Sequence, residues 1–166
     1  MKKKVLRRLE TYWKLEAVNV LLLPVLGWYL IVRAGGVISA PVLLAMSATA
    51  WVLVVGAATW KMEVLKLHGR NAQAQKLLNI LARCRTPSAI LVGTSTVGAC
   101  FEWLQNGFSP AAIGAITFAV MAALEYVNYY VVQLQHFDHG SDFKRLLAGQ
   151  GFREAHLAKA IRRGKS

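Results

Sequence analysis

The sequence predicts an all-α integral membrane protein, a four-helix bundle with both termini in the cytoplasm and short cytoplasmic amphipathic helices beside it. The first observation is that 55% of the 166 residues are apolar. They gather in four stretches of roughly 20 residues, the length that crosses about 30 Å of hydrocarbon. The second is that nineteen of the twenty Lys and Arg residues lie in three patches, residues 2–14, 61–85 and 144–165. Two spans separate successive patches, so the positive-inside rule places all three in the cytoplasm.

The four predicted spans differ in polarity. The first contains Pro24, which should kink it. The second is nearly free of polar groups and should face lipid over much of its surface. The third carries serines, threonines, Gly93 and Gly98, a composition that suits the inside of a bundle. The spans are residues 15–32, 41–60, 87–104 and 111–134.

The remaining segments are too short for a separate soluble core, so residues 1–166 form a single membrane domain. The cytoplasmic connection 61–86 contains an amphipathic stretch in which Leu77, Leu78 and Leu81 share one face. We expect that stretch to lie on the membrane or against the bundle. The cytoplasmic tail, residues 135–166, should end in a basic surface helix.

The net charge of +12 and the isoelectric point near 10.2 would indicate nucleic acid as the partner of a soluble protein. Here the basic residues flank membrane spans, where anionic lipid headgroups are the nearest counter-charge. We therefore expect the lipid bilayer and its anionic headgroups as partners, and no nucleic acid. Compactness and charge pattern favour the bacterial plasma (inner) membrane. The residues expected to contact lipid headgroups are Lys2, Lys3, Lys4, Arg7, Arg8, Arg162 and Arg163.

Two similar tetrapeptides place a carboxylate and an amide one helical turn apart. They are Glu16-Ala17-Val18-Asn19 in the first span and Glu125-Tyr126-Val127-Asn128 in the fourth. Glu125 lies about ten residues, or about 15 Å, from the cytoplasmic end of its span, deeper than any other ionisable residue. Because an acid there costs roughly 2.5–3.5 kcal/mol on insertion scales, it should face the bundle interior, close to Glu16 or Asn19.

This pattern has two interpretations. In the first, the residues form an ion or proton site, for which we select Glu16, Asn19, Glu125, Asn128 and Tyr129. In the second, they form a structural hydrogen-bond network that joins the first and fourth spans through the two asparagines. For Tyr129 the alternative is membership of an interfacial aromatic belt with Tyr126 and Tyr130.

A second cluster, His136, Asp138 and His139, follows the fourth span and has side chains that can ligate a divalent metal ion. Its spacing matches no known metal motif, and such residues more often act as helix caps and surface groups. The sequence names no cofactor, and it contains no glycine-rich phosphate loop, GxSxG or HExxH. An enzyme is therefore the less favoured class.

A small residue recurs at every fourth position of the fourth span, Ala111, Ala115, Ala119 and Ala123. Such a stripe allows close helix packing, within the monomer or between copies. We expect self-association, because four short spans enclose little volume and a permeation path forms more easily between copies.

These features favour an oligomeric ion or small-solute transporter or channel with intramembrane carboxylates. The first alternative is a non-transporting accessory protein that binds lipids or a partner. The second is a membrane-embedded metal-dependent enzyme that would use Glu16, Glu63, Glu125 and the histidine cluster.

Overall fold

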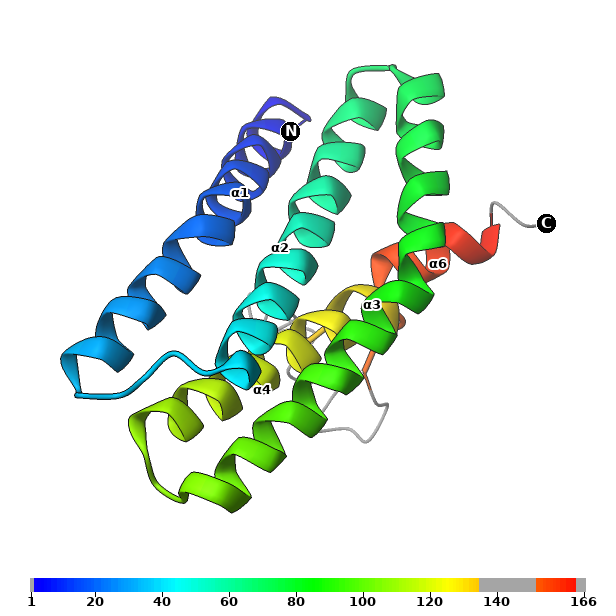
Figure 1. Cartoon of the computed structure of the whole chain (residues 1–166). Helices are drawn as coiled ribbons and strands as arrows, with labels where there is room; N and C mark the ends of the chain where they lie inside the picture. Colours follow the sequence, from blue (N-terminus) through cyan, green and yellow to red (C-terminus); the bar gives the residue numbers. More distant parts are fainter. Residues whose placement is uncertain (1, 135–151, 164–166) are drawn as a thin grey trace.

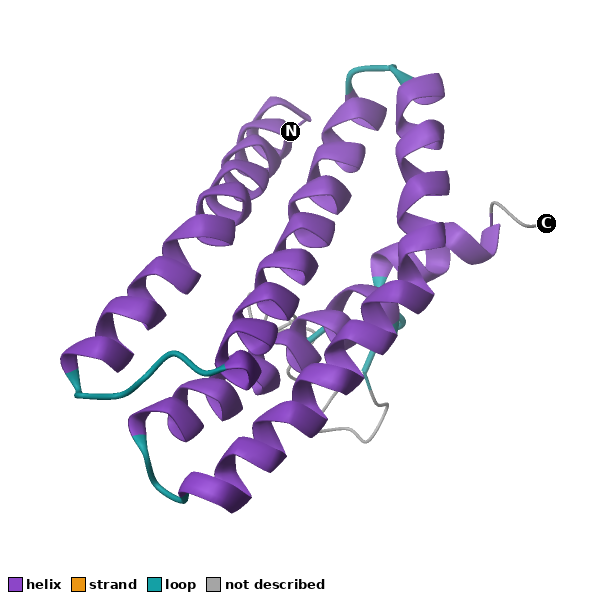
Figure 2. Ribbon diagram, in the orientation of Figure 1, coloured by secondary structure: helices purple, strands orange, loops and turns teal. Residues whose placement is uncertain are grey.

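The computed structural model describes residues 2–134 and 152–163, without the side chains of residues 2–5. These residues form five helices, as predicted for an all-α protein (Figures 1 and 2). In Figure 1, α2 lies at the centre and packs against α1, α3 and α4. The helices are α1 Lys2–Arg33, α2 Ala40–Leu67, α3 Asn71–Asn106, α4 Pro110–Tyr130 and α6 His156–Arg163.

Three helices, α1 from Leu6 onward, α2 and α4, are long and apolar enough to cross a membrane. The chain is therefore consistent with an integral membrane protein. Although α3 has 36 residues, it is not one of these three, because polar and charged residues interrupt its apolar stretches.

No break in the helix marks the predicted boundary between the cytoplasmic connection, 61–86, and the third span. Residues 61–67 complete α2, and a single helix then runs from Asn71 to Asn106 with Pro87 in its interior. The amphipathic stretch and the predicted third span are therefore consecutive parts of α3.

Contacts with neighbouring helices on both sides of Pro87 explain why α3 continues through it. Before the proline, Leu81 is buried, and its carbonyl accepts a hydrogen bond of 2.9 Å from the Tyr130 hydroxyl of α4. After it, the Ser88 hydroxyl accepts a bond of 2.8 Å from the Trp51 indole of α2. Tertiary contacts of this kind stabilise a helix despite the hydrogen bond that proline removes.

The fourth predicted span is shorter than expected, since α4 ends at Tyr130 rather than Leu134. The chain then turns: the Asn128 side-chain oxygen accepts a hydrogen bond of 2.8 Å from the Leu134 amide. Beyond the turn, Val132 pairs with Glu154 in an isolated antiparallel bridge. This pairing supplies backbone hydrogen bonds that would otherwise continue the helix.

The bridge returns the chain to the bundle, where α6 is seated. Leu157 and Ile161 of α6 are buried in one apolar cluster with Met62 of α2, Leu78 of α3 and Tyr129 of α4. The sequence predicted a basic surface helix here. Its apolar face instead packs on α3 and α4, and its basic residues remain exposed.

The alanine stripe of α4 is used within the chain. Ala111, Ala115 and Ala119 are buried in a cluster with Ala45 of α2 and Ala99 of α3. Of the two interpretations of the stripe, packing within the monomer therefore applies to these three alanines.

Candidate carboxyl site between the first and fourth helices

Glu16 of α1 and Glu125 of α4 lie close enough together for their charges to interact. The Tyr129 hydroxyl donates a hydrogen bond of 2.6 Å to one oxygen of Glu16. The Trp60 side chain is within hydrogen-bonding reach of the same carboxyl, and Asn128 is within reach of the Glu125 carboxyl. Side chains from α1, α2 and α4 thus meet at one site, called the carboxyl site below.

One oxygen of each carboxyl, Oε2 of Glu16 and Oε2 of Glu125, is buried without a hydrogen-bond partner among the described residues. An ionised carboxylate can accept about four hydrogen bonds, and leaving a buried one unsatisfied is costly. Two facing carboxylates also repel each other. A proton shared between them, or a bound cation, would relieve both costs.

Two glycines allow the helices to approach closely enough to form this site. A Cβ atom on Gly56 of α2 would lie 2.5 Å from the Tyr129 hydroxyl oxygen. A Cβ atom on Gly27 of α1 would overlap the Phe118 ring of α4. Gly56 therefore lets the Tyr129 ring pass along α2 toward Glu16, and Gly27 lets α1 lie against α4.

A cavity of about 260 Å³ adjoins the carboxyl site. Asn128 and Tyr129 line it from the side of the site, and His156 and Leu157 of α6 line its other side. Polar side chains therefore continue from the carboxyl site toward the end of the bundle that holds α6. The remaining lining residues are Leu9, Thr59, Trp60, Glu63, Leu67 and Gln133.

The structure brings together four of the five residues predicted for the ion or proton site. The exception is Asn19, whose side chain makes no hydrogen bond with the described residues. Asn128 also has a structural role, since its side-chain oxygen holds the turn at Leu134. The predicted network through both asparagines is therefore not formed, because of the two only Asn128 makes a side-chain hydrogen bond with the described residues.

Glu63, the third carboxylate proposed for a metal enzyme, does not join Glu16 and Glu125 in a metal-binding group among the described residues. Glu63 forms an ion pair of 2.7 Å with Lys66. Among the described residues, no group of three or more His, Cys, Asp and Glu side chains could hold a metal ion. His136, Asp138 and His139 lie outside the described residues.

Sequence reasoning missed Glu102 of α3, which is buried. Its side chain is 6% exposed. The Ser39 hydroxyl donates a hydrogen bond of 2.8 Å to one of its oxygens, and the Asn106 amide donates one of 2.9 Å to the other. The four-residue spacing of Glu102 and Asn106 was a signal in the sequence. The contact with Ser39 was not, because it joins residues 63 positions apart.

The residues expected to contact lipid headgroups lie at the start of α1 and on α6. Arg7, Arg8, Arg162 and Arg163 are exposed, and Lys2, Lys3 and Lys4 lie in the first turn of α1. The Arg8 guanidinium donates a hydrogen bond of 2.6 Å to the Tyr12 hydroxyl, so its charge is held near the helix.

Comparisons with protein-family models, curated proteins and solved structures found no match.

Proposed function

We propose that this chain is a small polytopic protein of the bacterial plasma membrane that transports an ion or small solute, with a proton or monovalent cation bound at the carboxyl site. The observation that supports this most strongly is the pair of facing carboxyls, Glu16 and Glu125, each with a buried oxygen that lacks a partner among the described residues. A purely structural network would be expected to satisfy these oxygens. The adjoining cavity offers a route to one end of the bundle.

The proposal includes four spans, with α3 as the fourth membrane helix. The hydroxyls of Thr94, Ser95 and Thr96 each bond to a carbonyl of the preceding turn of α3, at 2.8–3.0 Å. Such bonds satisfy a hydroxyl without water. Ile90 and Val97 are exposed on the same helix, as expected of side chains that face lipid.

With four spans, the positive-inside rule places both termini and the α2–α3 turn in the cytoplasm. Reporter fusions at Gly69 and after Ser166 should then report the cytoplasm, and fusions at Gly36 and Gly107 the opposite side. A cytoplasmic signal from Gly36 would contradict this topology.

The proposal also includes self-association. Since three alanines of the stripe are buried within the chain, we assign the contact with a second copy to the exposed face of α1, on which Leu21 and Val25 are 72% and 66% exposed. Mass measurement in detergent and in bilayers tests the assembly state, and a monomer in both would contradict this part.

The transport proposal is tested with the purified chain in liposomes that contain a pH-sensitive dye, under imposed proton, Na⁺ or K⁺ gradients. Flux that depends on pH is expected from the parent. Glu125→Gln should abolish that flux, because the amide can neither gain nor lose a proton. Glu10→Gln on α1 is the matched control and should leave the flux unchanged.

Two outcomes would contradict transport at the carboxyl site. One is the absence of flux under every gradient, which would favour the accessory-protein alternative. The other is an equal effect of Glu125→Gln and Glu10→Gln on the flux, which would remove the special role of Glu125.

A further inference from the structure

We propose that a groove between α1 and α4 binds one acyl chain of a phospholipid, and that Arg33 contacts the anionic headgroup of the same lipid. The groove, called the apolar groove below, has a volume of about 460 Å³. The proposal goes beyond transport at the carboxyl site and does not depend on it. It requires only that α1 and α4 cross a membrane, for which both are long and apolar enough.

The apolar groove is about as long as one membrane leaflet is thick. On α1 its lining runs from Leu23 to Ala34, and on α4 it runs from Pro110 to Met121. Each stretch rises about 16 Å, and one leaflet contributes about 15 Å to a hydrocarbon core of about 30 Å. In Figure 1 the end of α1 lies beside the start of α4, and this end is the mouth of the groove. An acyl chain that enters at the mouth therefore has a matching length of groove to fill.

Two glycines shape the floor of the apolar groove. A Cβ atom on Gly27 would overlap the Phe118 ring, and a Cβ atom on Gly114 would overlap the Ile31 side chain. Phe118 and Ile31 are buried, whereas Leu30 on the wall is 55% exposed. The two helices therefore meet along a narrow line, and the walls on one side of that line remain open to lipid.

The lining selects hydrocarbon. Thr117 is its one polar residue, and the Thr117 hydroxyl donates a hydrogen bond of 2.8 Å to the Ile113 carbonyl of the same helix. Its proton is therefore already used within α4. An occupant of the groove meets apolar side chains along the whole length, and burial of apolar surface favours binding.

A helix from a second copy is too wide for the apolar groove. A helix is about 10 Å across with its side chains, so a length of about 16 Å occupies about 1,300 Å³. The groove has about 460 Å³, which suits a single hydrocarbon chain. Leu21 and Val25, which we assign to self-association, do not line the groove, so a lipid and a second copy can bind at the same time.

Arg33 is placed to contact the headgroup. It is the last residue of α1, is exposed, and adjoins Ala34 at the mouth of the groove. It is also the one Lys or Arg outside the three basic patches, on the opposite side of the membrane from them in the proposed topology. A cation on that side does not help to fix the orientation. A guanidinium group binds phosphate oxygens well, which gives Arg33 a role beside an apolar groove.

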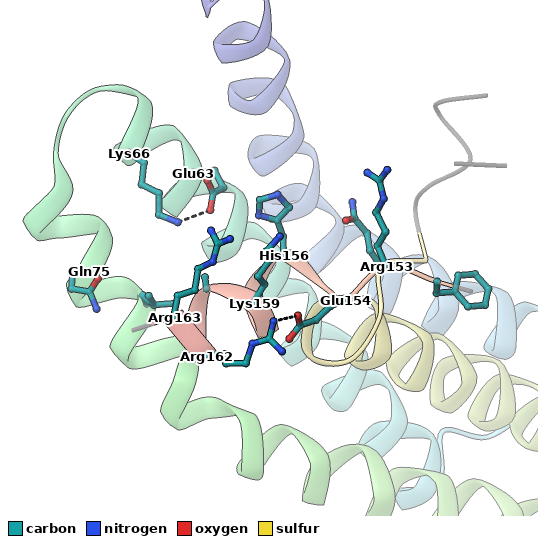
Figure 3. Close-up of a pocket in the computed structure, with 13 residues that line it drawn as sticks. Glu63, Lys66, Gln75, Arg153, Glu154, His156, Lys159, Arg162 and Arg163 are labelled. Carbon is teal, nitrogen blue, oxygen red and sulfur yellow. Dashed lines mark hydrogen bonds and ion pairs between the residues drawn. The ribbon is translucent and has the colours of Figure 1, made fainter. Parts of the chain in front are cut away.

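The cavity beside α6 provides a contrast (Figure 3). It has a volume of about 780 Å³ and a lining that is mainly charged and polar. Lys66 pairs there with Glu63 at 2.7 Å, and Arg162 pairs with Glu154 at 2.8 Å. An acyl chain in that cavity would remove charged groups from water, which is costly. The apolar groove carries no such cost.

Native mass spectrometry of the full-length chain in detergent tests the proposal, because it counts bound lipids and copies of the chain together. The anionic probe is palmitoyl-oleoyl phosphatidylglycerol, and the zwitterionic control is phosphatidylcholine with the same acyl chains. Thr117→Trp fills the apolar groove. Thr94→Trp on α3 is the matched control, since Thr94 is also exposed, also bonds to a carbonyl of its own helix and does not line the groove.

Two further variants complete the design. Arg33→Gln removes the proposed headgroup contact, and Arg83→Gln removes an exposed arginine of α3 that does not line the groove. Circular dichroism and size exclusion confirm that each variant is folded. If Thr117→Trp does not fold, Ile113→Trp repeats the test at a second exposed position of the lining.

We expect the parent to bind one phosphatidylglycerol about tenfold more tightly than phosphatidylcholine. Its Kd should rise about tenfold or more in Thr117→Trp, because the indole takes the space of several methylene groups, and should stay unchanged in Thr94→Trp. Arg33→Gln should remove the preference for phosphatidylglycerol, and Arg83→Gln should keep it.

Three results would overturn the proposal. The first is equal binding of the two lipids by the parent or by none of the variants differently from the parent. The second is an equal effect of Thr117→Trp and Thr94→Trp, or a lipid preference that survives Arg33→Gln. The third is loss of a dimer in Thr117→Trp with lipid binding unchanged, which would assign the groove to a second copy of the chain.

Discussion

Two acidic sites at opposite ends of the bundle have opposite hydrogen-bond environments. Glu102, between α3 and the start of α2, receives one hydrogen bond on each oxygen, from Ser39 and Asn106. Glu16 and Glu125, between α1 and α4, face each other, and one oxygen of each lacks a partner among the described residues. The comparison separates a carboxylate that joins two helices through its hydrogen bonds from a pair that we propose binds a cation or proton.

The largest expected difference is in stability after each acid is replaced by leucine. Glu102→Leu removes two hydrogen bonds to a buried charged acceptor, from the half-buried Ser39 hydroxyl and the exposed Asn106 amide, and should lower the free energy of unfolding by about 3 kcal/mol. Glu125→Leu loses its contact with Asn128 but also removes the repulsion from Glu16. Its cost should be about 1 kcal/mol. Chemical unfolding in detergent micelles measures both, and equal losses would remove the distinction between the sites.

A second difference concerns the glycine beside the carboxyl site. Gly56→Ala places a methyl group against the Tyr129 ring, and overpacking of this kind should cost about 2 kcal/mol and disturb the bond between Tyr129 and Glu16. Gly93→Ala is the control, because a Cβ atom there meets no described atom within 4 Å. It should be neutral or slightly stabilising, since alanine is the better helix former. A neutral Gly56→Ala in the same unfolding assay would contradict the packing at Tyr129.

Removal of the tyrosine hydroxyl tests the direct hydrogen bond between Tyr129 and Glu16. Tyr129→Phe should lower the free energy of unfolding by about 1.5 kcal/mol, the usual value for a bond to a charged group. Tyr29→Phe, at a position 59% exposed, should have no effect. If both substitutions behave alike, the bond to Glu16 does not contribute to stability.

The smallest expected effect depends on pH. Ionisation of both carboxyls at the site would make them repel, so the stability of the parent should fall as pH rises through that ionisation and be fully present below it. Glu125→Gln removes the second charge. Its free energy of unfolding should therefore be about 1 kcal/mol higher than that of the parent at high pH, and nearly equal to it at low pH. Glu102→Gln should destabilise instead, because its amide nitrogen meets donor groups. A series of Tm measurements at different pH values checks both variants. If Glu125→Gln lowered the Tm at high pH and Glu102→Gln raised it, the assignment of the two sites would be reversed.

Much of the helical fold could be predicted because its signals are local. Apolar stretches gave the helices α1, α2 and α4, and the spacing of Glu125 and Asn128 placed a carboxylate and an amide on one face. The depth of Glu125 in its helix then indicated a partner on α1, and Glu16 lies there. An acid within a membrane span usually lies between helices, because contact with lipid is costly.

The remainder depends on contacts between distant residues. Nothing near Glu102 identifies Ser39 as its partner, and Ser39 alone predicts only a helix cap, a role it also fills by accepting from the Val42 amide. Likewise, the bridge between Val132 and Glu154 ends α4 early, although the local sequence is apolar enough to continue the helix.

The seating of α6 has a consequence for biogenesis. Leu157 lies in one cluster with residues of α2, α3 and α4, so its binding surface does not exist until those three helices have been synthesised and have met. The chain emerges from the ribosome from its N-terminus, and α6 follows them all. Met62 and Tyr130 are almost fully buried in the finished fold. Until α6 docks, part of the surface of these two side chains is exposed. Docking of this helix is therefore a natural last step of assembly, and an incompletely synthesised chain would present that surface to quality-control proteases.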